Sequence, residues 1–139
     1  MREGLRFLWG HPVLRTMTIA GSLQSFAGGA FMGQLVVFAD RVLGIREPDA
    51  RVGLLFTAWS VGGILGSLVL PRLLRRTGAF QVMLAALPAS ALLGLAVVLT
   101  TDWRIALVAI TAWGSTYLMV IVNTMTYAQE VTPRSSRAG

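Results

Sequence analysis

The sequence predicts an all-α, polytopic membrane protein with four transmembrane helices. Of its 139 residues, 55% are hydrophobic and 13% are charged, whereas about a quarter of the residues in a soluble domain are charged. The charged residues lie outside four long stretches, at residues 16–39, 52–71, 77–101 and 105–129. A soluble protein built from four such stretches in succession would have no polar surface, so we expect this chain to lie in a lipid bilayer.

Each uncharged stretch is long enough to cross a bilayer once. The stretches contain 24, 20, 25 and 25 residues, and a hydrocarbon core of about 30 Å requires roughly 20 helical residues. We therefore expect a four-helix transmembrane region at residues 13–139, ending in a short cytoplasmic tail. Its spans should lie at about 14–39, 52–71, 78–101 and 105–129.

The segment before the first span is predicted to be an amphipathic helix. Within residues 1–12, Leu5, Leu8 and Trp9 share one helical face, while Arg6 lies on another. This pattern is typical of a short helix that lies on a membrane surface. We expect residues 1–12 to form a cytoplasmic entry segment of this kind.

The linkers between the spans are short. They are predicted at residues 40–51, 72–76 and 102–104, so consecutive helices should be antiparallel neighbours. Pro88 lies inside the third span, where it should kink the helix because proline lacks a backbone N–H.

The arginines predict the orientation of the chain. All 12 basic residues are arginines, and they lie outside the spans. Cytoplasmic loops carry the excess of positive charge in membrane proteins, so both termini should be cytoplasmic. Eight arginines fall on the side of the termini and four on the other side: Arg2, Arg6, Arg15, Arg72, Arg75, Arg76, Arg134 and Arg137 against Arg41, Arg46, Arg51 and Arg104.

The composition excludes several functions. The chain has no cysteine and one histidine, His11, which excludes disulfides, thiol catalysis and zinc bound by cysteine. It has no phosphate-binding loop and no paired carboxylates for acid–base catalysis. We expect no enzymatic activity, no metal, no cofactor and no nucleic-acid partner.

Small residues recur every four positions along the spans, a spacing that lets helices approach closely in lipid. The glycines predicted to pack helices together are Gly29, Gly33, Gly62 and Gly66. Such contacts either hold the helices in place or slide during a conformational change.

Polar side chains inside the spans are the candidate site. Thr116, Asn123 and Tyr127 share a narrow arc of the fourth span, and the first span carries Gln24 and Gln34. Polar groups at membrane depth face a bundle interior or a watery cavity. These five residues therefore either form interhelical hydrogen bonds or line a substrate path. No span has an acidic residue near its centre.

Three parts of the sequence resemble exporters of the major facilitator superfamily, in the branch of siderophore and macrolide exporters. Residues 3–9 (EGLRFLW) and 11–15 (HPVLR) resemble the approach to the seventh helix. Residues 62–66 (GGILG) and 71–76 (PRLLRR) are similar to the join between helices eight and nine, and residues 127–133 (YAQEVTP) to the end of helix ten. The match covers nearly the whole chain in order.

The resemblance implies part of a C-terminal half, helices seven to ten of a twelve-helix transporter in a bacterial inner membrane. The parent activity would be proton-driven efflux of a small apolar or amphipathic compound by alternating access. The first and fourth spans would line the cavity, and Arg72, Arg75 and Arg76 would form a cytoplasmic gate or serve as the topology signal alone. The partners would be the bilayer and the remaining helices, or a second copy of the chain.

Two departures limit the resemblance. Leu70 and Pro71 stand where the family often has an aspartate before its basic cluster, which puts that gating contact in doubt. A complete member of the family has twelve helices, so a chain with helices seven to ten alone would supply only one wall of the cavity. The alternative is a four-helix interaction or accessory module with no transport activity of its own.

Overall fold

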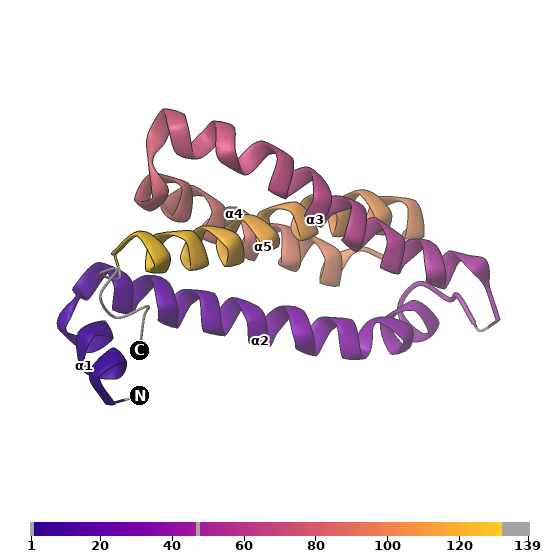
Figure 1. The fold of residues 1–139 in the computed structure, drawn as a ribbon. Helices are drawn as coiled ribbons and strands as arrows, with labels where there is room; N and C mark the ends of the chain where they lie inside the picture. Colours follow the sequence, from indigo (N-terminus) through magenta and orange to yellow (C-terminus); the bar gives the residue numbers. More distant parts are fainter. Residues whose placement is uncertain (1, 47, 132–139) are drawn as a thin grey trace.

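The computed structural model describes residues 2–46 and 48–131. Its described part contains five helices: α1 (Arg2–Gly10), α2 (Pro12–Arg41), α3 (Ala50–Thr77), α4 (Ala79–Leu99) and α5 (Trp103–Val131), shown in Figure 1. Helices α2 to α5 are each long and apolar enough to cross a membrane. The predicted all-α fold with four spans is confirmed, whereas the predicted C-terminal tail lies outside the described residues.

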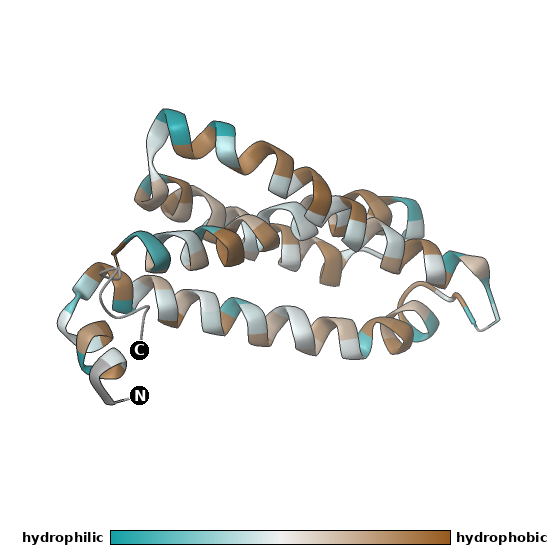
Figure 2. Ribbon diagram, in the orientation of Figure 1, coloured by the Kyte–Doolittle hydropathy of each residue, from teal (hydrophilic) through white to brown (hydrophobic). Residues whose placement is uncertain are grey.

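Helix α5 is the centre of the bundle. It packs most extensively against α3, then against α4, and least against α2. Figure 1 shows α2 running along one side of the bundle while α3 crosses the other. Figure 2 shows hydrophobic residues along the four long helices and hydrophilic residues gathered near their ends, as expected for spans in lipid.

The bundle has two ends with separate apolar cores. Near α1, Met17 of α2 packs with Met83 of α4 and with Val120 of α5. At the opposite end, Leu35 of α2 lies in the same buried cluster as Val97 of α4. We call the first of these the α1 end; it also contains the last turns of α3 and α5.

The predicted linker at residues 72–76 is wrong, because these residues belong to α3. The helix continues to Thr77 and is separated from α4 by Gly78 alone. Gly78 has a φ of 87°, which glycine adopts readily because it lacks a Cβ. Arg75 and Arg76 occupy the last turn of α3, where positive charge is favourable near the exposed carbonyl groups.

Two prolines lie inside continuous helices. Pro71 lies in α3, and Pro88 lies in α4, which runs from Ala79 to Leu99. Membrane helices tolerate proline because neighbouring groups satisfy the freed carbonyl. The error at residues 72–76 has a simple cause: the uncharged stretch ends before Arg72, whereas the helix continues through the arginines to Thr77.

The N-terminus of α3 is capped by Asp49. Its carboxylate accepts the backbone N–H of Arg51 at 2.8 Å and the guanidinium of Arg51 at 2.6 Å. The hydrogen bond from the Arg51 side chain, followed by that from its backbone, holds the pKa of the Asp49 carboxyl below its ordinary value. The charged form of Asp49 is therefore favoured in the folded chain.

This capping contact predicts acid-sensitive stability. A carboxyl with a lowered pKa stabilises the fold above its unfolded pKa of about 3.9, and that contribution disappears as the pH falls through the lower, folded value. We expect Asp49→Asn, which still caps a helix, to reduce the fall in unfolding temperature between pH 6 and pH 3 in detergent. Arg51→Gln should do the same. An unchanged pH dependence in both variants would contradict the prediction.

Candidate functional site

Helices α3 and α5 meet at glycines that bring their backbones together. A Cβ atom placed on Gly62 would lie 2.0 Å from the carbonyl oxygen of Thr111, and one on Gly66 would lie 2.3 Å from that of Ser115. On α5, a Cβ on Gly114 would lie 2.6 Å from a carbonyl oxygen of α3. Any side chain at these three positions would push the helices apart, so α3 and α5 form one tightly packed unit.

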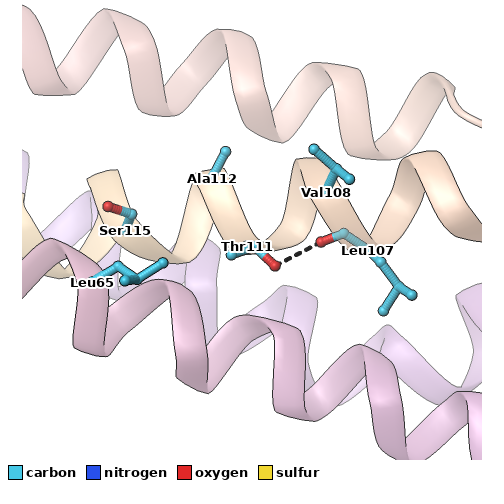
Figure 3. A pocket seen from close by; sticks show the side chains of 6 residues that line it. All are labelled: Leu65, Leu107, Val108, Thr111, Ala112 and Ser115. Carbon is cyan, nitrogen blue, oxygen red and sulfur yellow. Dashed lines mark hydrogen bonds between the residues drawn. The ribbon is translucent and has the colours of Figure 1, made fainter.

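An apolar groove of about 440 Å³ runs beside this contact (Figure 3). Two hydroxyl-bearing side chains line it, Ser115 and Thr111, and the hydroxyl of Thr111 donates to the carbonyl oxygen of Leu107 at 2.8 Å, as the dashed line shows. Leu65 and Val108 at its rim are 48% and 71% exposed. In a membrane these outward-facing apolar side chains would contact lipid or another helix, and the groove offers little polar recognition.

The glycines that pack α2 are not the two predicted. Around Gly29 and Gly33, the described residues leave open space where a Cβ would stand. The contacts of α2 are made instead by Gly28, whose Cβ would lie 2.3 Å from the ring of Tyr117, and by Gly21 against Thr124. Gly21 belongs to the same four-residue series as Gly29 and Gly33, but the helix contacts α5 through Gly21 and Gly28, which are seven residues apart.

Four aromatic rings from three helices meet inside the bundle. Trp113 of α5 lies with its ring centre 4.8 Å from that of Phe31 on α2 and 5.1 Å from that of Trp59 on α3, both edge-on. Tyr117 lies 5.0 Å from Trp59. We call these four residues the aromatic cluster. Edge-on ring pairs at such distances add packing energy beyond their buried area.

A buried hydroxyl joins this cluster to polar groups. The Oγ of Ser90 on α4, which is 1% exposed, accepts the indole N–H of Trp113 at 3.0 Å and the side-chain amide of Gln24 on α2. We call this arrangement the Ser90 node. It links α2, α4 and α5 through one oxygen atom. A groove of about 460 Å³ between these helices is lined by Gln24, Ser90 and Trp113 together with apolar side chains.

The structure does not bring the five predicted polar residues into one cavity. Gln24 lies at the Ser90 node, whereas Gln34 is exposed on the outer surface of α2. Thr116 donates to the carbonyl oxygen of Trp113 in its own helix at 3.0 Å. In the described part of the chain, Gln24 thus makes an interhelical hydrogen bond, Thr116 bonds within α5, and Gln34 faces outward.

The other two polar residues lie near the start of α4. Asn123 is fully buried and its amide donates to the carbonyl oxygen of Ala79 at 2.8 Å. Its own Oδ1 is buried with no hydrogen-bond partner among the described residues. Tyr127 packs against the buried cluster that includes Met17 and Met83. Asn123 therefore also forms an interhelical hydrogen bond.

Sequence reasoning missed the aromatic cluster, although a signal was present. Trp and Tyr are enriched where membrane helices meet water, yet Trp59 and Trp113 lie well inside the second and fourth uncharged stretches. Aromatic residues so far from the ends of a span indicate a packed or binding interior. The partner of the Trp113 indole, Ser90, shows no such signal because serine is common in packed membrane helices.

The three arginines of the predicted gate are exposed on the last two turns of α3. Within the described part of the chain, none of them forms an ion pair. The guanidinium of Arg72 donates to the carbonyl oxygen of Leu68 in the same helix at 3.4 Å. The described residues also contain no group of three side chains that could hold a metal ion.

Comparison with known proteins shows what this chain is similar to. Residues 1–139 match the model of the family described as Major Facilitator Superfamily. A stretch of 66 residues is 38% identical to the protein named multidrug efflux pump Tap of Mycolicibacterium fortuitum. That stretch is 48% of this chain and 15% of the length of the pump. No solved structure matches this chain.

Proposed function

This chain belongs to the major facilitator superfamily of membrane transporters, and we propose that it is part of a pump that exports a small apolar or amphipathic compound. The 38% identity to a multidrug efflux pump carries this proposal. The aromatic cluster and the adjoining groove support it, because aromatic and aliphatic side chains with a few polar groups are typical of sites that bind such compounds.

The four spans correspond in this proposal to helices seven to ten of the transporter. Helices α2 and α5 line the substrate path, with Gln24 and the aromatic cluster facing it when the transporter opens. The remaining helices, or a second copy of the chain, supply the other walls. The chain performs no chemical reaction, since transport by alternating access requires binding and rearrangement alone.

Transport is driven by protons in this proposal, and the proton-binding carboxylate lies in another part of the transporter. The four uncharged stretches have no acidic residue, and intramembrane carboxylates are the usual proton relays. The protein lies in the inner membrane of a bacterium with both termini cytoplasmic. The excess of arginine on the side of the termini supports this orientation.

Helices α3 and α5 move together in this mechanism. The contacts at Gly62 and Gly66 bring the two backbones close together, and α3 is the helix against which α5 packs most extensively. Helix α2 contacts α5 less extensively, through Gly28 and Gly21. The α2–α5 contact is therefore where a rearrangement costs least.

The proposal is tested by measuring accumulation of a fluorescent cationic dye in bacteria that lack their own efflux pumps. We expect cells that express this 139-residue chain alone to accumulate as much dye as cells with an empty vector. Cells that express it together with the coding sequence for the remaining helices should accumulate several-fold less, and a protonophore should abolish the difference. Trp113→Ala should weaken export.

Two outcomes would contradict the proposal. Export by the chain alone would show that four helices suffice. Absence of export by the complete assembly, with the protein present in the membrane, would favour the accessory module. The DNA beside the coding sequence separates the same alternatives, because six helices encoded upstream and two downstream support a partial transporter.

A further inference from the structure

The two ends of the bundle differ in how their arginines are paired. At the end opposite α1, two of the four arginines are paired: Arg46 with Asp40 at 3.6 Å and Arg51 with Asp49 at 2.6 Å, whereas Arg41 and Arg104 form no ion pair with a described side chain. At the α1 end, no arginine whose side chain is described forms an ion pair with another described side chain. The arginines whose side chains are described there are Arg6, Arg15, Arg72, Arg75 and Arg76, and all five are exposed.

These arginines come from two segments that are far apart in the sequence. The start of α2 packs against the start of α4 through Met17 and Met83, and α4 follows the end of α3 after Gly78 alone. The arginines of α1 and early α2 therefore lie at the same end of the bundle as those of α3, as Figure 1 shows for the helices that carry them. Glu130, an acidic residue at this end whose side chain is described, is exposed and forms no ion pair with another described side chain.

Helix α1 adds exposed apolar side chains to this basic end. Leu5 and Trp9 lie one helical turn apart and are 52% and 60% exposed. The guanidinium of Arg15 lies over the Trp9 ring at 5.8 Å. An apolar face next to cations is the arrangement of helices that lie in the headgroup region, and tryptophan is enriched at that depth.

We propose that the α1 end is a binding surface for anionic phospholipid headgroups. Leu5 and Trp9 enter the bilayer surface, while Arg6 and Arg15 contact lipid phosphates from α1 and α2. Arg72, Arg75 and Arg76 contact them from the end of α3. Charge complementarity selects this occupant: five exposed guanidinium groups have no carboxylate partner among the described side chains, and arginine matches phosphate oxygens in a bidentate way. This inference depends on membrane insertion and is independent of efflux.

The test is native mass spectrometry of the purified full chain, released from detergent after incubation with phosphatidylglycerol or phosphatidylcholine. We expect the chain to retain phosphatidylglycerol preferentially, with the preference falling as salt rises. A triple variant, R72Q/R75Q/R76Q, should reduce that preference about tenfold or more, given the contribution of each basic residue near an anionic surface. The matched control is R41Q/R46Q/R104Q, which removes the same charge from the opposite end and should keep the preference.

Three results would overturn the proposal. Equal retention of the two lipids by the unmodified chain would show no headgroup selection. Equal losses in both triple variants would show an effect of net charge alone. An unchanged preference for phosphatidylglycerol in R72Q/R75Q/R76Q would show that these arginines do not bind the headgroups. Carboxylates of another protein segment would then be their partners. Helical circular dichroism of each variant verifies the fold, and Trp9→Ala provides a second probe that leaves every arginine in place.

Discussion

Gly62→Ala is expected to destabilise the bundle more than any other single methyl group added to the described residues. The new Cβ would lie 2.0 Å from the carbonyl oxygen of Thr111, about half the ordinary contact distance. The obstacle is backbone in a helix, so no side chain can rotate away. Helices α3 and α5 must separate along their whole contact, which also releases Gly66.

We expect a loss of at least about 3 kcal/mol, the upper range for overpacking of a core. Thermal unfolding in detergent, followed by circular dichroism, measures it. The matched control is the adjacent Gly63→Ala, whose Cβ would meet a methyl group of Leu118 at 3.5 Å, an ordinary contact. Equal unfolding temperatures for the two variants would show that the close approach of α3 and α5 is not formed.

Trp113→Ala is expected to have the second large effect, about 3–5 kcal/mol, as for other buried aromatic residues replaced by alanine. The indole is 7% exposed and contacts rings of both α2 and α3. It also lies against α4, since a Cβ on Gly94 would lie 3.2 Å from the ring. Removing it leaves a cavity where four helices meet and deprives Ser90 of a hydrogen-bond donor.

Two further variants separate packing from hydrogen bonding at this position. Trp113→Phe keeps a ring but loses the indole N–H, and Ser90→Ala removes the acceptor. Trp113→Phe should cost about 0.6–1.7 kcal/mol, from the average to the largest value for a hydrogen bond between membrane helices. Ser90→Ala should cost more, because Ser90 accepts from both Trp113 and Gln24. Trp9→Ala, at a residue 60% exposed on α1, controls for loss of a large side chain. A loss for Trp113→Ala no greater than for Trp9→Ala would contradict the packing described here.

The sequence predicted the number and type of helices well, because the requirement to cross a bilayer acts on composition alone. The four uncharged stretches correspond to α2–α5, and no knowledge of neighbours is needed to recognise them. The ends of helices were harder to place. At residues 72–76, three arginines after Pro71 suggested a linker, although helices in a membrane protein continue past the hydrocarbon core into water.

The faces of the helices were only partly predictable. Gly62 and Gly66 lie at the closest helix contact, but at Gly29 and Gly33, which have the same spacing, an added Cβ would meet no described atom within 4 Å. A repeat of small residues predicts that another helix can approach at those positions, but it does not predict which helix does so. The polar residues pose the same problem, since Asn123 and Gln34 look alike in sequence yet one is buried and the other exposed.

By itself, the sequence determined that this protein is a membrane protein of four spans, and its motifs pointed to the family. Those properties follow from local composition and from residues close together in the chain. Only the tertiary structure decided that Trp113 and Ser90 meet Gln24, and that α3 rather than α2 packs most closely on α5. Such contacts depend on which helix stands beside which. In lipid that choice rests on detailed fit between surfaces rather than on hydrophobic pattern.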